Sequence, residues 1–107
     1  MIVKNASNLG FPRMGKHREL KFTLEKYWSG QASEADLLAT ARNVRKEHWQ
    51  LQVGAGIDIP PSNDFSLYDH VLDTTVMVGA VPARARGLQP GTRRLDSLRM
   101  VRPRCDL

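Results

Sequence analysis

The stretch SNLGFPRMGKHRELKFTLEKYWSG, residues 7–30, joins a short apolar segment to an amphipathic helix through a basic loop. Residues 7–11 have the length and composition of a short buried strand, and Pro12 closes that strand. From Arg18 onward apolar side chains recur at helical spacing, and Gly30 ends the pattern. The expected buried stripe of this helix comprises Leu20, Leu24, Tyr27 and Trp28.

A second, longer helix is expected after Ser33, because Ser33 and Asp36 have the spacing of a capping box. Gly54 and Gly56 end this helix. The side chains expected on its buried face are Leu37, Ala41, Val44, His48 and Leu51. The segment IDIPP, residues 57–61, then predicts a second short strand.

The loop SNDFSLYD, residues 62–69, leads into a third predicted helix, which Ser66 or Asp64 is expected to cap. Its expected buried stripe consists of Leu67, Val71, Leu72, Thr75 and Val78. The resulting order is strand, helix, helix, strand, helix, which favours parallel pairing and an α/β architecture. Two parallel strands need further strands beside them, so this order predicts the opening of a larger barrel or wound sheet.

An unclosed sheet leaves apolar faces without neighbours, and these are expected to make the isolated chain poorly soluble or molten. The side chains expected to be exposed for this reason are Leu24, Tyr27, Trp28, Trp49 and Val76.

Positive charge is concentrated in the tail of the chain. The net charge is +5, yet residues 1–83 hold nine basic and nine acidic side chains, whereas residues 84–107 hold seven arginines and two acids. The tail also lacks aromatic residues, and a boundary is therefore predicted near Pro82 to Arg84. A basic patch on a folded surface indicates nucleic-acid binding, but a basic tail is weaker evidence for it.

Other functional classes find little support. No apolar run is long enough to cross a bilayer, and the start MIVKNASNLG lacks the apolar core of a secretion signal. Cys105 is the single cysteine, which excludes a disulfide framework or a cysteine-rich metal site. A soluble, cytoplasmic protein is expected.

Both predicted strands are followed by loops rich in polar residues. In parallel α/β folds such loops gather on one face, so the two loops are expected to lie together at a site. Arg18 and Lys21 at a helix start oppose the helix dipole, and a bound carboxylate or phosphate would offset that cost. The alternative is a solvated cationic turn with Glu19 and Glu25 nearby.

Several short motifs resemble the amino-terminal end of cobalamin-independent methionine synthase, namely GFPR, RELK, DFSLYDHVLD and GAVP in that order. The resemblance runs from about Asn8 to Arg84. It implies part of the first of two (β/α)8 barrels, in an enzyme that moves a methyl group from 5-methyltetrahydropteroyltriglutamate to homocysteine in methionine biosynthesis. Pro60 departs from the family, which usually has an aliphatic residue there.

The resemblance implies that RELK, comprising Arg18, Glu19, Leu20 and Lys21, belongs to the folate-binding site. The family's zinc site lies in the other barrel, so no cofactor and no catalytic residue is expected in this chain. His48 is expected to pack in its helix, His17 to be exposed, and His70 to have no catalytic role. Helix capping is the expected role of Asp64 and Asp69, rather than acid–base chemistry.

After Arg84 the chain departs from the family. One hypothesis is that residues 84–107 are family coding sequence read in a shifted frame, and the alternative is a genuine variant terminus. Three functions remain open: a fragment carrying the folate half-site without activity of its own, a short subunit that pairs with the missing remainder of the synthase, or a basic nucleic-acid-binding protein.

Overall fold

The computed structural model describes residues 4–80 and 82–83, and the predictions for residues 84–107 lie outside this range. The described residues form three helices, α1 (Glu19–Trp28), α2 (Glu34–Gly54) and α3 (His70–Met77). The chain divides into two compact units, Met1–Phe65 and Ser66–Leu107, which are considered separately.

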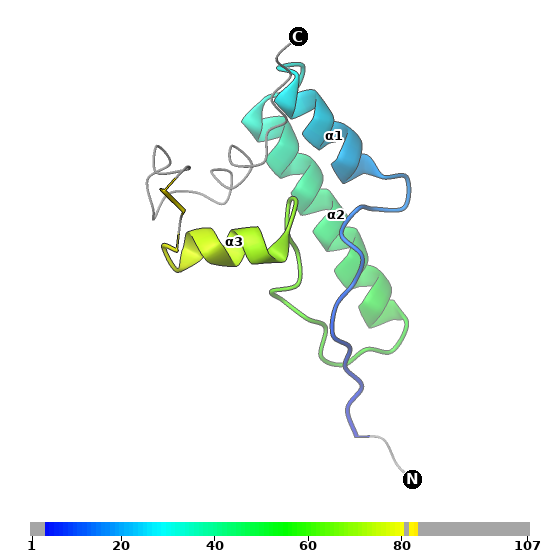
Figure 1. Cartoon of the computed structure of the whole chain (residues 1–107). Helices are drawn as coiled ribbons and strands as arrows, with labels where there is room; N and C mark the ends of the chain where they lie inside the picture. Colours follow the sequence, from blue (N-terminus) through cyan, green and yellow to red (C-terminus); the bar gives the residue numbers. More distant parts are fainter. Residues whose placement is uncertain (1–3, 81, 84–107) are drawn as a thin grey trace. The chain divides into compact units, whose positions relative to one another are not determined.

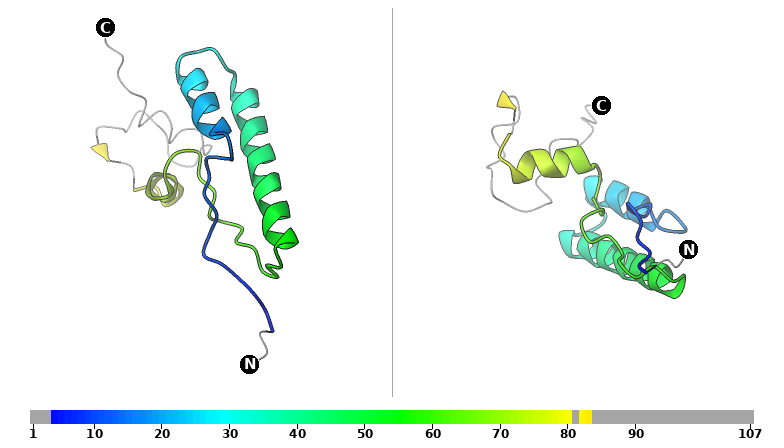
Figure 2. Two further views of the ribbon diagram at one scale, coloured as in Figure 1. Left: turned by 90° about the vertical axis from the view of Figure 1, so that its right-hand side faces the viewer. Right: turned by 90° about the horizontal axis from the view of Figure 1, so that it is seen from below.

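In the first unit, α1 and α2 form an antiparallel hairpin whose helices lie side by side (Figures 1 and 2). Leu20 and Leu37 are completely buried. The other buried side chains of the hairpin are Leu24, Ala41 and Val44. Burying a leucine contributes about 1.5–3 kcal/mol, so this seam is the main stabilising contact of the hairpin. The predicted stripes are confirmed here, although Tyr27 and Trp28 are only half-buried.

The predicted stripe of α2 is wrong at its end. Leu51 is 57% exposed, and the next residue, Gln52, is buried instead. Gln52 is satisfied there because its Oε1 accepts a hydrogen bond from the Asn8 side chain (2.9 Å) and its Nε2 donates to the carbonyl of His48 (3.1 Å). A polar side chain thus takes the last core position of the helix because the amino-terminal segment brings it a partner.

The two predicted strands are not confirmed as strands. Within the described residues they meet at one isolated parallel bridge between Ser7 and Ile59. The amides of Asp58 and Ile59 both donate to the carbonyl of Ala6, and the Asp58 carboxylate accepts the Ala6 amide at 2.8 Å. A side chain therefore supplies a hydrogen bond that a neighbouring strand would supply in a full sheet.

In the second unit, α3 is capped by Asp69, whose carboxylate accepts the Leu72 amide at 3.1 Å. The predicted caps Ser66 and Asp64 are therefore wrong, whereas the capping role expected of Asp69 is confirmed. The predicted stripe is also wrong at two positions, because Val71 is 72% exposed and Val78 is 65% exposed. The helix begins several residues later than expected, and Val76 is its buried residue.

The expected exposure of apolar side chains is correct only in part. Leu24 and Val76 are buried, contrary to the prediction, whereas Trp49 is 40% exposed. The indole of Trp49 also donates to the carbonyl of Pro61 at 3.0 Å, so this exposed ring has a defined place beside the second loop.

Candidate functional site

The basic loop ends in a tight turn directly before α1. The amide of Arg18 donates to the carbonyl of Gly15 at 3.2 Å. Gly15 has φ +84°, and Arg18 itself has φ 58° and ψ 32°, in the left-handed region. An arginine in that region is uncommon and costs free energy. The helix consequently begins at Glu19, with Arg18 in the N-cap position and no side-chain cap.

Amides at and just before the start of α1 already have acceptors within the chain. The Leu20 amide donates to the carbonyl of Met14 (3.3 Å), and the His17 amide donates to the Glu19 carboxylate (3.2 Å). The pKa of Glu19 is lowered chiefly because its own backbone amide donates to the carboxylate, and the His17 amide adds to this effect. The Glu19 carboxylate thus occupies the place where an anion would meet these helix donors.

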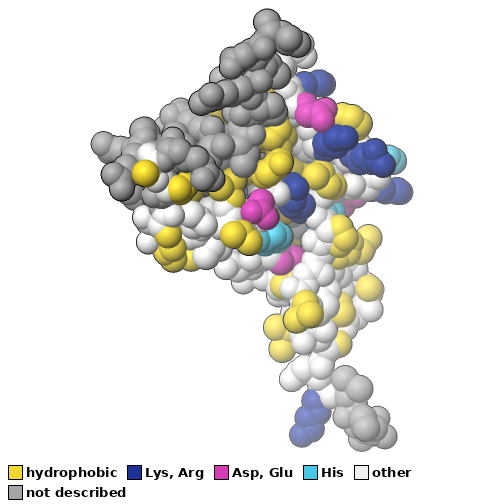
Figure 3. Space-filling view, viewed as in Figure 1, with side chains coloured by type: hydrophobic (Ala, Val, Ile, Leu, Met, Phe, Trp, Pro, Cys, Tyr) yellow, Lys and Arg dark blue, Asp and Glu magenta, His cyan; other side chains and the backbone are white. Residues whose placement is uncertain are grey.

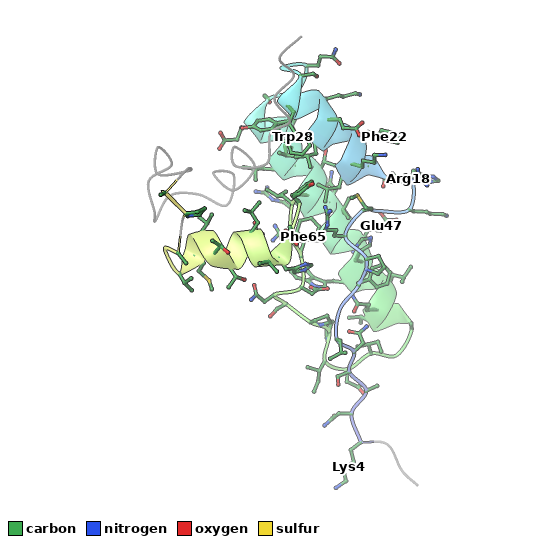
Figure 4. All side chains as sticks on the ribbon, in the orientation of Figure 1. Lys4, Arg18, Phe22, Trp28, Glu47 and Phe65 are labelled. Atoms are coloured by element: carbon green, nitrogen blue, oxygen red, sulfur yellow. The ribbon has the colours of Figure 1, made fainter. Side chains whose placement is uncertain are left out.

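The basic side chains around this turn face solvent. Arg18, His17 and Lys16 are exposed, and the Lys21 side chain is 46% exposed at 4.0 Å from the Glu25 carboxylate. Figure 3 shows Lys and Arg side chains gathered over the start of α1, and Figure 4 shows Arg18 where the loop enters the helix.

The four residues of RELK therefore differ in their placement. Arg18 and Lys21 present cations to solvent, and the Glu19 carboxylate folds back over the turn. Leu20 is completely buried in the seam between α1 and α2, so its side chain anchors the helix start to the core. The sequence-based hypothesis named all four residues together, and the structure gives them three different physical roles.

Asp64 of the second loop contacts the end of the segment 7–11, where the basic loop begins. That the two loops lie together at a site stays a prediction, because the parallel strands on which it depended are not confirmed. The Asp64 carboxylate accepts the Phe11 amide at 2.8 Å. A Cβ on Gly10 would lie 3.3 Å from the Asp64 Cβ, so the second loop closely approaches the segment 7–11 at this point. The Phe11 ring packs on His48 of α2, with ring centroids 4.4 Å apart. Sequence reasoning missed this role of Asp64, because no local pattern connects residues 53 positions apart.

Two histidines are placed as predicted, because His17 is exposed and His48 packs against Phe11 as a helix residue. His70 is also exposed, and its lack of a catalytic role stays a prediction. Among the described residues, no group of three or more His, Cys, Asp or Glu side chains is arranged to hold a metal ion. The zinc implied by the resemblance therefore has no fitting ligand set in this part of the chain, and Cys105 lies outside it. No helix in the described range has the length and apolar composition needed to span a bilayer.

Comparison with known proteins gives this loop and helix start a family context. Residues 5–103 match the family described as cobalamin-independent synthase, N-terminal domain. The chain belongs to this family. It is 58% identical over 82 residues to the 5-methyltetrahydropteroyltriglutamate–homocysteine methyltransferase of Xylella fastidiosa strain M23, a match that covers 77% of this chain and 11% of that protein.

Other relatives of the same name show a similar likeness. The protein of Mesorhizobium japonicum is 63% identical over 78 residues, covering 73% of this chain and 10% of the relative. The probable methyltransferase of Schizosaccharomyces pombe is 55% identical over 85 residues, covering 79% and 11%. The matched part of the chain thus spans about a tenth of the length of these relatives. The family match over residues 5–103 includes both loops of the candidate site.

Proposed function

We propose that this chain supplies part of the folate-binding site of a cobalamin-independent methionine synthase, namely the part that holds the glutamyl tail of 5-methyltetrahydropteroyltriglutamate. In this proposal the described segment is the opening of the family's amino-terminal (β/α)8 barrel. Methyl transfer to homocysteine requires the remainder of the synthase, because residues 4–80 and 82–83 offer no fitting zinc ligand set. The chain by itself then binds but does not catalyse.

The observation that carries the proposal is the exposed pair of cations, Arg18 and Lys21, at the start of α1 in a chain that belongs to this family. The residues occupy the N-cap and N3 positions, one helical turn apart. A glutamyl tail carries one carboxylate per unit, and guanidinium and ammonium groups form strong charge-assisted hydrogen bonds with carboxylates.

The geometry at the helix start also indicates which groups would hold such a tail. Because the Glu19 carboxylate and the Met14 carbonyl already accept amides at the helix start, the side chains of Arg18 and Lys21 are the available donors. Lys21 must exchange its weak pairing with Glu25, at 4.0 Å on an exposed surface, for the ligand. That exchange costs little.

Calorimetric titration of the full chain with 5-methyltetrahydropteroyltriglutamate tests the proposal. The double variant Arg18→Ala/Lys21→Ala is expected to weaken binding at least about tenfold, because two charge-assisted contacts are lost. Arg42→Ala/Lys46→Ala is the matched control, since it removes one arginine and one lysine from exposed positions of α2. This control is expected to change the affinity by less than about twofold.

Equal weakening in both double variants would show a non-specific charge effect and contradict the proposed site. Titration with the corresponding monoglutamate adds a second criterion, because only the longer tail gains from additional cations. An affinity that does not depend on the number of glutamyl units would place the bound ligand elsewhere.

A further inference from the structure

The segment 6–11 is held to the chain by a small set of backbone and side-chain hydrogen bonds rather than by a sheet. Two aspartates bracket it: Asp58 accepts the amide of Ala6, and Asp64 accepts the amide of Phe11, each at 2.8 Å. Between them lies the parallel bridge from Ser7 to Ile59. The two carboxylates therefore make the same kind of contact at opposite ends of one segment.

Their positions relative to the basic loop differ. Asp58 acts at Ala6, before the bridge, whereas Asp64 acts at Phe11, where the loop toward Arg18 begins. Phe11 is thereby fixed twice, because its backbone is bonded to Asp64 and its ring packs on His48 of α2. The other end of the loop is fixed by Leu20, which is completely buried.

Gly10 leaves the space that this arrangement needs. A Cβ at residue 10 would lie 3.3 Å from the Asp64 Cβ and 3.4 Å from its Oδ2. The first contact requires Asp64 to shift by a few tenths of an ångström, and the second is an ordinary van der Waals contact. The absence of a side chain at Gly10 thus leaves Asp64 room beside the Phe11 amide to which it is bonded.

We infer that Asp64 is a positioning residue for the candidate glutamyl-tail site: by fixing the Phe11 backbone it sets the path of the loop that presents Arg18. This inference rests on the proposed function for its ligand, but its geometric part stands separately. A bound tail touches Arg18 and Lys21, and Asp64 acts on it only through the loop. Fixing the loop before binding reduces the ordering cost that the ligand must otherwise meet.

The charge of Asp64 makes the test sharp. A carboxylate that has no positioning role can only repel an anionic ligand, so its removal leaves binding unchanged or strengthens it. Removal of a carboxylate that positions the loop instead weakens binding of the ligand. Asp64→Asn keeps an oxygen that can accept the Phe11 amide while removing the charge, and it therefore separates the two effects.

The experiment compares Asp64→Ala, Asp64→Asn and the matched control Asp58→Ala in the full chain. The first readout is the affinity for 5-methyltetrahydropteroyltriglutamate, and the second is hydrogen exchange at the amides of Arg18 and Leu20. Asp64→Ala is expected to weaken binding about three- to tenfold and to speed exchange at both amides. Asp64→Asn is expected to restore both properties, and Asp58→Ala to leave both within about twofold.

Tighter binding in both Asp64 variants, unchanged exchange in Asp64→Ala, or equal losses in Asp58→Ala would overturn the inference. If Asp64→Ala does not fold by circular dichroism, Gly10→Ala replaces it, since crowding the carboxylate is expected to reproduce both effects at smaller size. Absence of binding by the unmodified chain would overturn the proposed function instead, and the exchange data would still decide whether Asp64 positions the loop.

Discussion

The two helices of the first unit begin in opposite ways. At the start of α2, Ser33 is extended and both hydrogen bonds of a capping box are present, with the Ser33 side chain accepting the Asp36 amide and the Asp36 carboxylate accepting the Ser33 amide. At the start of α1, Arg18 lies in the left-handed region and makes no side-chain cap. Amides there are satisfied by Glu19 itself and by the carbonyl of Met14.

The difference shows which helix start is optimised for stability. A serine cap contributes about 1 kcal/mol, and its signature is entirely local. A left-handed arginine instead costs about 1–2 kcal/mol, which the fold tolerates because Leu20 and the turn at Gly15 hold the chain there. Strain of this kind gathers at functional sites, and the start of α1 is where the exposed cations lie.

The largest expected effect comes from Gly15→Ala. Gly15 has φ +84°, and an added Cβ would collide with the Glu19 carboxylate. Gly30→Ala is the matched control, because Gly30 has φ +80° with nothing within 4 Å of the added atom. We expect losses of about 2–3 kcal/mol for Gly15→Ala and about 1 kcal/mol for Gly30→Ala in chemical denaturation.

The difference between the two glycine variants measures how closely the Glu19 carboxylate is held over the turn. Equal losses would mean that Glu19 moves away freely, and the description of the α1 start as a self-capped turn would then be wrong.

The next-largest effects on stability are expected from substitutions at the two N-cap residues, Ser33 and Arg18. Ser33→Ala is expected to destabilise the chain by about 1 kcal/mol, because the Asp36 amide loses its acceptor. Arg18→Gly is expected to stabilise it by about 0.5 kcal/mol, because glycine adopts the left-handed region without strain. Thermal unfolding followed by circular dichroism measures both changes. A loss of stability in Arg18→Gly would show that the arginine side chain makes a favourable contact exceeding its backbone cost.

The contrast also explains how much could be predicted from the sequence. The capping box of α2 and its buried stripe from Leu37 to Val44 depend on residues within a few turns, and both predictions are confirmed. The error at Leu51 arose because Gln52 acquires its partner, Asn8, from 44 residues away. A helical period alone favours the apolar neighbour, and only the folded path of the amino-terminal segment reveals the polar one.

The candidate site likewise has features that could be predicted from the sequence and features that could not. The family resemblance and the basic residues of the loop predicted Arg18 and Lys21 as candidate site residues, but the closing of the turn by Glu19 and the contact of Asp64 with Phe11 depend on how the loops fold. The strands failed as predictions because the described residues contain too few strand neighbours to form a ladder, so that only the bridge between Ser7 and Ile59 remains.

The smallest expected effect is a pH dependence shared by both helix starts. The pKa of Glu19 is lowered from its ordinary value of 4.5, chiefly by its own backbone amide, and that of Asp36 is lowered from 3.8, chiefly by the Ser33 amide. A carboxyl whose pKa is lower in the folded state stabilises the fold above its ordinary pKa. This contribution is lost as pH falls from the ordinary value through the lowered one.

Glu19→Gln and Asp36→Asn should each lower stability at neutral pH slightly and flatten the decline toward acid. Because the two groups lie on separate helices with no shared contact, the flattening should be additive in the double variant. Urea denaturation across the acidic range measures it. If Glu19→Gln keeps the unmodified slope while Asp36→Asn flattens it, then the α2 start alone is held by a carboxylate, and the self-capped turn of α1 does not persist in solution.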